Sequence, residues 1–151
     1  MIEPIKDITD IRGMFRMTGR VVERRIEDLE SDRDQWVEDF AKINGSDLED
    51  TNVWDAIASD WAVAFPDEST ELVALQDFQS EAESYAEWRF RDTEFIAERE
   101  FTDFAKDYAD QVRELDTSDW PYNCIDWERA AADLKDDYNA ADLDGYTFLF
   151  K

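Results

Sequence analysis

The chain has 151 residues, of which 40 are acidic and 16 are basic, so its net charge near pH 7 is −24. Such a charge excludes binding to DNA, RNA or an anionic membrane by ordinary electrostatic attraction, and its natural partner is a basic surface. Aromatic residues make up 14% of the chain. They supply enough apolar area for one folded core, in a compact or elongated unit, rather than a disordered acidic tail.

Two residue types are scarce. Histidine is absent, which removes the commonest general base, the usual catalytic triads and most zinc sites. The single cysteine, Cys124, cannot form an intrachain disulfide, and we expect it to be a small buried residue. No segment resembles a signal peptide or a membrane span, so the expected location is the cytoplasm.

Residues 1–45 are expected to form an N-terminal helical arm that carries a basic stripe. Residues 1–25 hold six basic and four acidic residues. Arginines recur there at intervals of four, which is typical of one helix face: Arg12, Arg16, Arg20 and Arg24. This stripe is either a solvated face or a surface that docks on acidic residues of the same chain or of a second subunit.

Residues 46–151 are expected to form an acidic helical body. Before it, Ser31 predicts the start of a second short helix that ends at Gly45. Ser46 and Glu49 fit a capping box for a helix that runs to Pro66. Residues 66–69 predict a turn followed by the start of a further helix. The stretch 81–95 is aromatic and mixed, and its pattern does not separate helix from strand.

The clearest helical pattern covers residues 101–115. One face is apolar, with Phe101, Phe104, Ala105, Tyr108, Ala109, Val112 and Leu115. The opposite face carries a row of carboxylates, Asp103, Asp107, Asp110 and Glu114. A helix spaces such a row at about 5.5 Å, and one DNA strand carries a charge about every 3.4 Å. The row therefore suggests a surface that can be taken for nucleic acid.

The chain is expected to end in a helix and a hairpin. A loop that contains Asp116 and Asp119 precedes a helix capped by Asp126, with Asp133, Asp136 and Asp137 outside. The pair 144–145, Asp-Gly, signals a tight turn before alternating aromatic residues. The predicted fold is α+β and mainly α, with several short amphipathic helices and a small C-terminal β-hairpin.

Enzyme chemistry is not expected, and neither are a catalytic residue, a metal ion or a cofactor. The segment 142–145 resembles part of an EF-hand loop but places Ala140 and Lys151 where carboxylate ligands are needed. The enzyme-class alternative is a carboxylate-dependent Mg²⁺ hydrolase, for example through Asp136 and Asp137. Its sign would be acidic residues that converge in one pocket instead of spreading along helix exteriors.

Two stretches read together resemble the C-terminal portion of the ArdA family of antirestriction proteins. The first is FIAEREF at 95–101, followed by Asp103, Phe104, Ala105 and Tyr108. The second is CIDWE at 124–128, followed by Ala131, Asp133, Leu134, Tyr138, Asp144, Gly145, Tyr146 and Phe148. The resemblance covers about residues 90–151, whereas the N-terminal third departs from the family, which opens with a strand-containing domain.

The resemblance implies an elongated, dimeric, acidic DNA mimic that occupies the DNA-binding groove of a type I restriction-modification enzyme and so protects incoming phage or plasmid DNA. The expected partners are thus a basic protein groove and a second copy of the chain, with no direct nucleic acid or membrane contact. The expected contact surface is acidic and consists of Asp103, Asp107, Asp110, Glu114, Asp116, Asp119, Asp133, Asp136 and Asp137.

Two further interpretations stay open. The same polyanionic surface suits an inhibitor or adaptor of another basic protein, such as a CRISPR effector or a transcription regulator. Alternatively, the acidity is an adaptation to high intracellular salt, which 24 Asp against 16 Glu would suit.

Overall fold

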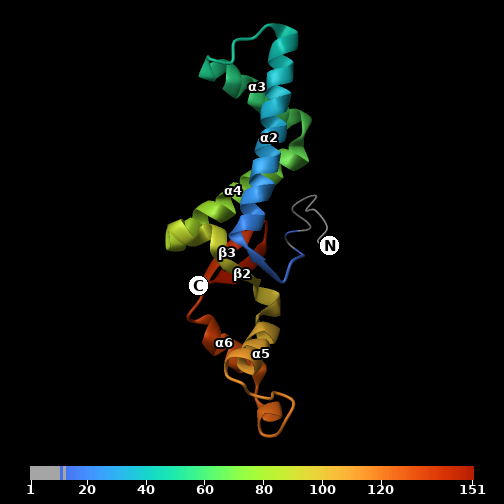
Figure 1. Cartoon of the computed structure of the whole chain (residues 1–151). Helices are drawn as coiled ribbons and strands as arrows, with labels where there is room; N and C mark the ends of the chain where they lie inside the picture. Colours follow the sequence, from blue (N-terminus) through green and yellow to red (C-terminus); the bar gives the residue numbers. More distant parts are fainter. Residues whose placement is uncertain (1–10, 12) are drawn as a thin grey trace.

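The molecule is elongated, with a small sheet in its middle and helices extending from both sides of it (Figure 1). The computed structural model describes Ile11 and residues 13–151, with only the backbone at 86–88. Its α-helices are α2 (Gly19–Asn44), α3 (Thr51–Ala64), α4 (Pro66–Ala86), α5 (Phe101–Val112) and α6 (Trp127–Lys135). Its strands are β1 (Arg16–Thr18), β2 (Glu94–Ala97), β3 (Asn139–Leu143) and β4 (Tyr146–Phe150). Short 3-10 helices are η1 (Glu87–Asp92), η2 (Glu98–Glu100) and η3 (Tyr122–Cys124).

The predicted C-terminal hairpin is confirmed. Strands β3 and β4 pair antiparallel with Leu143 opposite Tyr146. The two turn residues, Asp144 and Gly145, have φ of 50° and 86°, the left-handed conformation that a two-residue hairpin turn requires. The fold is therefore α+β and mainly helical, as the sequence indicates.

The hairpin belongs to a larger sheet that the sequence does not reveal. Four antiparallel strands lie in the order β1-β2-β4-β3. Strand β1 has three residues and β2 has four, too few for a clear alternating pattern. Their pairing joins Arg16 to Ile96, which are far apart in sequence, so local periodicity carries no sign of it.

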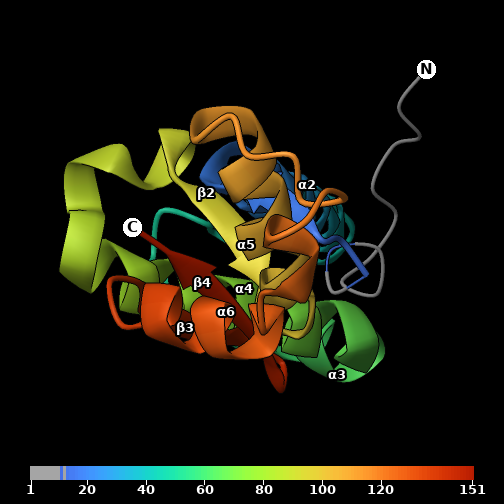
Figure 2. The same cartoon turned by 90° about the horizontal axis from the view of Figure 1, so that it is seen from below.

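The sheet separates two layers of helices, because successive strand residues point to opposite faces. Phe95 and Phe148 face the main core, where Phe78 of α4 and Val22 of α2 are fully buried. The intervening residues face the other way, where Ile96 and Leu149 pack against α5 and α6 in a smaller core of five buried residues. Figure 2 shows α5 and α6 in front of the sheet when the molecule is viewed from below.

Helix α2 is a single helix of 26 residues, so the prediction that Ser31 starts a separate helix is wrong. The reason is that the apolar spacing of Val22, Ile26 and Leu29 continues to Val37 and Ala41, all buried. The predicted end is correct. Gly45 follows the helix with φ 64° and donates its N–H to the carbonyl of Ala41.

The predicted capping box at residues 46–49 is also wrong. Glu49 N–H donates to Asp47 Oδ1 at 3.0 Å, which makes a turn instead. The cap of α3 is Asp50, whose carboxylate accepts the N–H of Asn52 at 3.0 Å. A helix was predicted to follow a turn at residues 66–69, but α4 already begins at Pro66, because proline fits the first helical position.

The predicted basic stripe is only partly helical. Arg20 and Arg24 lie on α2, but Arg16 lies in β1, and Arg12 falls outside the described residues. The position of Arg16 is set by its pairing opposite Ile96. The described residues between 13 and 45 therefore combine a strand with one long helix.

A buried ion pair joins α2 to α4. Arg25 donates through Nε to both carboxylate oxygens of Glu71, at 3.0 and 3.2 Å, and through Nη2 to Oε1 at 2.5 Å. The side chains are 13% and 5% exposed. This bidentate contact fixes the position of α2 along the axis of α4.

Candidate partner-binding surface

All nine residues of the predicted contact surface are exposed. They lie on α5, on the loop from α5 to α6, and on α6 and the turn after it. We call residues 98–138 the α5–α6 module. It contains thirteen acidic and five basic residues, a net charge of −8.

The acidic row on α5 is shorter than predicted. Helix α5 ends at Val112, so Glu114 lies beyond it, in a positive φ of 56°. Asp103 and Asp107 lie on the helix with exposed side chains. Asp110 is exposed too, but its carboxylate accepts the N–H of Thr117 at 3.0 Å and its hydroxyl at 2.9 Å. Asp110 therefore holds the following loop in addition to carrying charge.

The loop after α5 is held by its own polar groups. Asp116 accepts the backbone N–H of Ser118 at 3.0 Å and its hydroxyl at 2.5 Å. These bonds, the hydroxyl contact first, lower the pKa of Asp116. Asp119 N–H donates to the carbonyl of Asp116 at 3.1 Å. The carboxylate of Asp116 and the backbone of Asp119 are thus held in place.

Helix α6 begins as predicted, with the carboxylate of Asp126 accepting the N–H of Arg129 at 3.2 Å. It ends at Lys135, so Asp133 lies on the helix but Asp136 and Asp137 lie in the turn that follows. The next residue, Tyr138, packs edge-on to the ring of Phe101 with centroids 5.1 Å apart. Burial raises the pKa of Tyr138 above its ordinary value.

The strongest concentration of negative charge lies elsewhere, in a region the sequence reading did not single out. We call residues 26–88 the acidic rod: the outer part of α2, all of α3, and α4 with the first residues of η1. It contains nineteen acidic and two basic residues, a net charge of −17. Fifteen of the eighteen acidic residues whose side chains the structure describes there are exposed. A running count of charge along the sequence would have found it.

The charge density of the rod is close to that of duplex DNA. Residues 26–44 of α2 span about 27 Å at 1.5 Å per residue. Seventeen charges of a DNA duplex occupy about 29 Å. The sequence charge of the rod, which includes the buried Glu71, is therefore similar to that of a DNA duplex as long as this part of α2.

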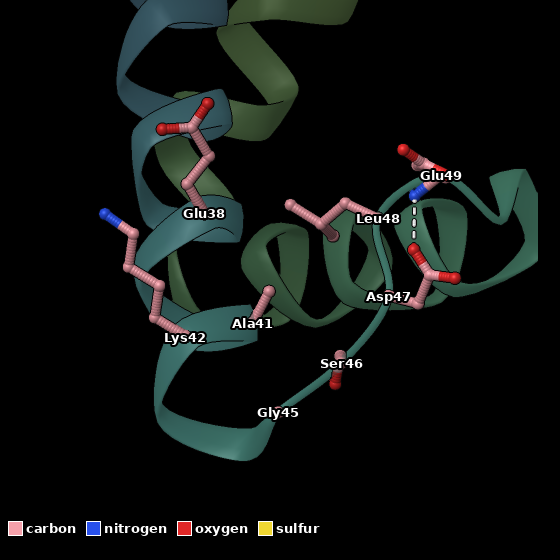
Figure 3. A pocket seen from close by; sticks show the side chains of 8 residues that line it. All are labelled: Glu38, Ala41, Lys42, Gly45, Ser46, Asp47, Leu48 and Glu49. Carbon is pink, nitrogen blue, oxygen red and sulfur yellow. Dashed lines mark hydrogen bonds between the residues drawn. The ribbon is translucent and has the colours of Figure 1, made fainter.

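The two basic residues of the rod do little to interrupt it. Arg33 lies 3.1 Å from Asp34 and has its guanidinium 5.0 Å from the ring centre of Trp54. Lys42 lies beside Glu38 at the edge of an open pocket of about 470 Å³ near the rod's end. Figure 3 shows Ala41 and Leu48 on the floor of this pocket. Its charged groups are set around the rim, which is not the convergent arrangement of a catalytic site.

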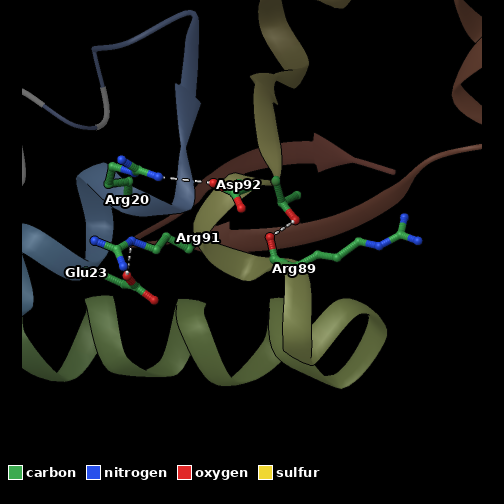
Figure 4. A network of polar contacts seen from close by, with 6 residues as sticks. Arg20, Glu23, Arg89, Arg91 and Asp92 are labelled. Atoms are coloured by element: carbon green, nitrogen blue, oxygen red, sulfur yellow. Dashed lines mark hydrogen bonds and ion pairs between the residues drawn. The ribbon is translucent and has the colours of Figure 1, made fainter.

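A positively charged zone separates the rod from the module. Residues 13–25 and 89–97 contain six arginines and three acidic residues. Arg20 Nη2 lies 3.2 Å from Asp92, and Arg91 Nε lies 3.7 Å from Glu23 (Figure 4). These pairs join the start of α2 to η1, so the zone stabilises the base of the rod.

Two expectations about chemistry can be examined in the described part of the chain. There, no group of three or more acidic or cysteine side chains is arranged to hold a metal ion. Cys124 is exposed, so the prediction that it is buried is wrong. It lies in η3, whose three residues contribute none to a core. No helix in residues 11 and 13–151 is long and apolar enough to cross a membrane.

Comparison with known proteins finds no matching family model, no similar curated protein and no similar solved structure.

Proposed function

We propose that this protein is an acidic DNA mimic that inhibits a DNA-binding defence enzyme, with a type I restriction-modification enzyme as its target. The observation that carries the proposal is the acidic rod, with its net charge of −17 over residues 26–88. This charge lies on the outside of helices that are packed together, so it is held in a defined shape. A flexible acidic tail would lack that shape.

The mechanism is competition for a basic groove. A groove that binds a polyanion is lined with lysine and arginine side chains. These donate charge-assisted hydrogen bonds to carboxylates in the same way as to phosphates. No covalent bond is made or broken, so inhibition requires only that the protein occupies the groove. Because such contacts are screened by ions, the affinity should fall steeply as salt rises.

The resemblance to the ArdA family supports the choice of target. Its stretches fall on β2 and α5, and then on η3, α6 and the β3–β4 hairpin. Of these elements, β2, α5, α6 and β4 contribute buried residues to the smaller core on one face of the sheet. By the same resemblance we propose that the protein acts as a homodimer in the cytoplasm.

The distribution of charge favours mimicry over salt adaptation. Adaptation to salt calls for acidic residues over the whole surface, whereas here the zone of residues 13–25 and 89–97 has a net charge of +3. The separation into a strongly negative rod and a positive base is better suited to a specific partner. The absence of a convergent acidic pocket in the described residues likewise favours binding over a Mg²⁺ hydrolase.

The test is a competition assay. Duplex DNA bound to a type I restriction-modification complex is titrated with the protein from low to high salt. Displacement that weakens with salt is expected, and reversal of charge at Asp103 and Asp107 should reduce it. Asp110 is left intact because it holds Thr117. No displacement at low salt would contradict the proposed target, and the same assay on a CRISPR effector would then test the alternative.

A further inference from the structure

The loop between α5 and α6 lies at one end of the molecule (Figure 1) and carries an exposed tryptophan. Trp120 is 80% exposed. The structure describes five tryptophan side chains, and the other four are partly or fully buried: Trp36, Trp54, Trp61 and Trp127. Tryptophan is also the residue type most enriched where binding energy concentrates in protein interfaces.

The loop that carries Trp120 is ordered by hydrogen bonds on both sides of it. We call residues 113–126 the anchor loop. Before Trp120, Thr117 is 6% exposed and both its N–H and its hydroxyl donate to Asp110. After it, Asn123 N–H donates to the carbonyl of Asp119 at 2.9 Å, and Cys124 N–H to that of Pro121 at 3.0 Å. The backbone around Trp120 is therefore fixed before any partner arrives, which lowers the entropy lost on binding.

The surroundings of Trp120 indicate the charge of the partner. The anchor loop contains four acidic residues, Glu114, Asp116, Asp119 and Asp126, and one basic residue, Arg113. The carboxylates near the tryptophan are repelled by an anionic membrane surface and attracted to a basic protein. An indole also stacks well on a guanidinium plane.

We propose that Trp120 is an apolar anchor that inserts into a pocket beside the basic DNA-binding groove of the target enzyme. This inference rests on the proposed function and names the residue that distinguishes the correct target from other basic grooves. Carboxylates alone would fit any groove built for a polyanion. Burying the indole adds an affinity that depends on a complementary pocket and that salt does not screen.

The experiment is the same DNA-displacement assay, with Trp120→Ala, Trp120→Phe and a charge variant that combines Glu114→Gln with Asp119→Asn. Loss of a buried tryptophan anchor corresponds to about a 30-fold weaker affinity. Trp120→Ala should show this loss at every salt concentration and keep the wild-type salt slope, because apolar contacts release no ions. Trp120→Phe should recover part of the affinity. The charge variant should instead flatten the salt slope and change affinity little at high salt.

Phe15→Ala is the matched control, because Phe15 is 60% exposed and lies in the positively charged zone, outside both the rod and the anchor loop. It should stay within twofold of wild type. Thermal unfolding of Trp120→Ala should match wild type, since the side chain is solvated.

Three results would overturn the inference. Equal affinity of Trp120→Ala and wild type would show that the indole stays in solvent. An equal loss in Phe15→Ala would show a nonspecific apolar effect. A change in the oligomeric mass of Trp120→Ala in sedimentation would place the indole against a second copy. No displacement by the wild type would instead overturn the proposed function and the inference with it.

Discussion

The acidic rod and the α5–α6 module lie on opposite faces of one sheet and are both rich in carboxylates, but they carry different kinds of information. The rod has nineteen acidic residues against two basic, and the module has thirteen against five. The module instead carries the exposed Trp120 on an ordered loop. The comparison separates two proposed roles: the rod would supply the DNA-like charge, and the module would supply the apolar contact that selects one target.

The rod depends on the pair between Arg25 and Glu71, which sets α2 against α4. Glu71→Ala removes the carboxylate that pairs with Arg25, whose side chain is only 13% exposed. Breaking such a buried pair from one side costs about 3–5 kcal/mol of folding free energy. Urea unfolding followed by circular dichroism should show a loss of this size.

Asp92→Ala serves as the control, because it breaks an exposed pair with Arg20 at the base of the rod. An exposed pair contributes at most about 1 kcal/mol. If the two variants lose similar stability, the buried pair does not fix the rod.

Matched sets of neutral substitutions separate the charge of the two regions. The rod set changes six exposed carboxylates to amides: Asp28, Asp32, Glu38, Asp55, Asp60 and Asp77. The module set does the same for Asp103, Asp107, Glu128, Asp133, Asp136 and Asp137. At about 0.5 kcal/mol for each exposed contact, six losses weaken DNA displacement about 100-fold.

We expect this full loss from the rod set and a smaller one from the module set, where five basic residues already interrupt the charge. Both sets should flatten the salt dependence. A larger loss from the module set would mean that the module, and not the rod, occupies the groove.

The anchor loop depends on Asp110 but not on Asp107, which precedes it on α5. Asp110→Ala leaves two donors of the buried Thr117 without their acceptor. Such a loss costs about 1–3 kcal/mol. Hydrogen exchange should show faster exchange in residues 113–126, whereas Asp107→Ala, which removes an exposed charge, should leave this segment unchanged.

The smallest expected effect concerns pH and the core of the module. The pKa of Tyr138 is raised in the folded protein, mainly by burial. The folded state therefore holds this proton more tightly than the unfolded state, so stability is complete below the unfolded pKa and falls as pH rises through the folded one. Tyr138→Phe should reduce the loss of melting temperature above pH 10. An unchanged alkaline profile would show that Tyr138 stays protonated or is not linked to unfolding.

Local signals in the sequence were sufficient where a single residue type determines the backbone. Gly45, Asp126 and the turn at 144–145 were placed correctly, because a left-handed glycine and a capping carboxylate act on their own neighbours. Ser31 failed as a helix start because burial of a continuous apolar stripe outweighs one potential cap.

Long-range features could not be read in this way. Strands β1 and β2 exist because they pair with each other and with β4, and neither has a pattern of its own. At the candidate surface, the exposure of Asp103, Asp107 and Asp133 followed from helical phase. The bond from Thr117 to Asp110 instead depends on how the loop folds back. The exposure of Trp120 likewise depends on tertiary structure, because tryptophan is usually a core residue.

At the base of the rod, the chain enters and leaves at neighbouring residues, which makes the length of the rod independent of the sheet. The chain leaves the sheet at Gly19 and returns at Thr93, and the N–H of Gly19 donates to the carbonyl of Thr93 at 3.1 Å. The whole excursion therefore starts and finishes at two adjacent points. Whole helical turns can be inserted or deleted at its far end while the sheet keeps its register, so the span of a groove that the protein matches can change independently of the rest of the fold.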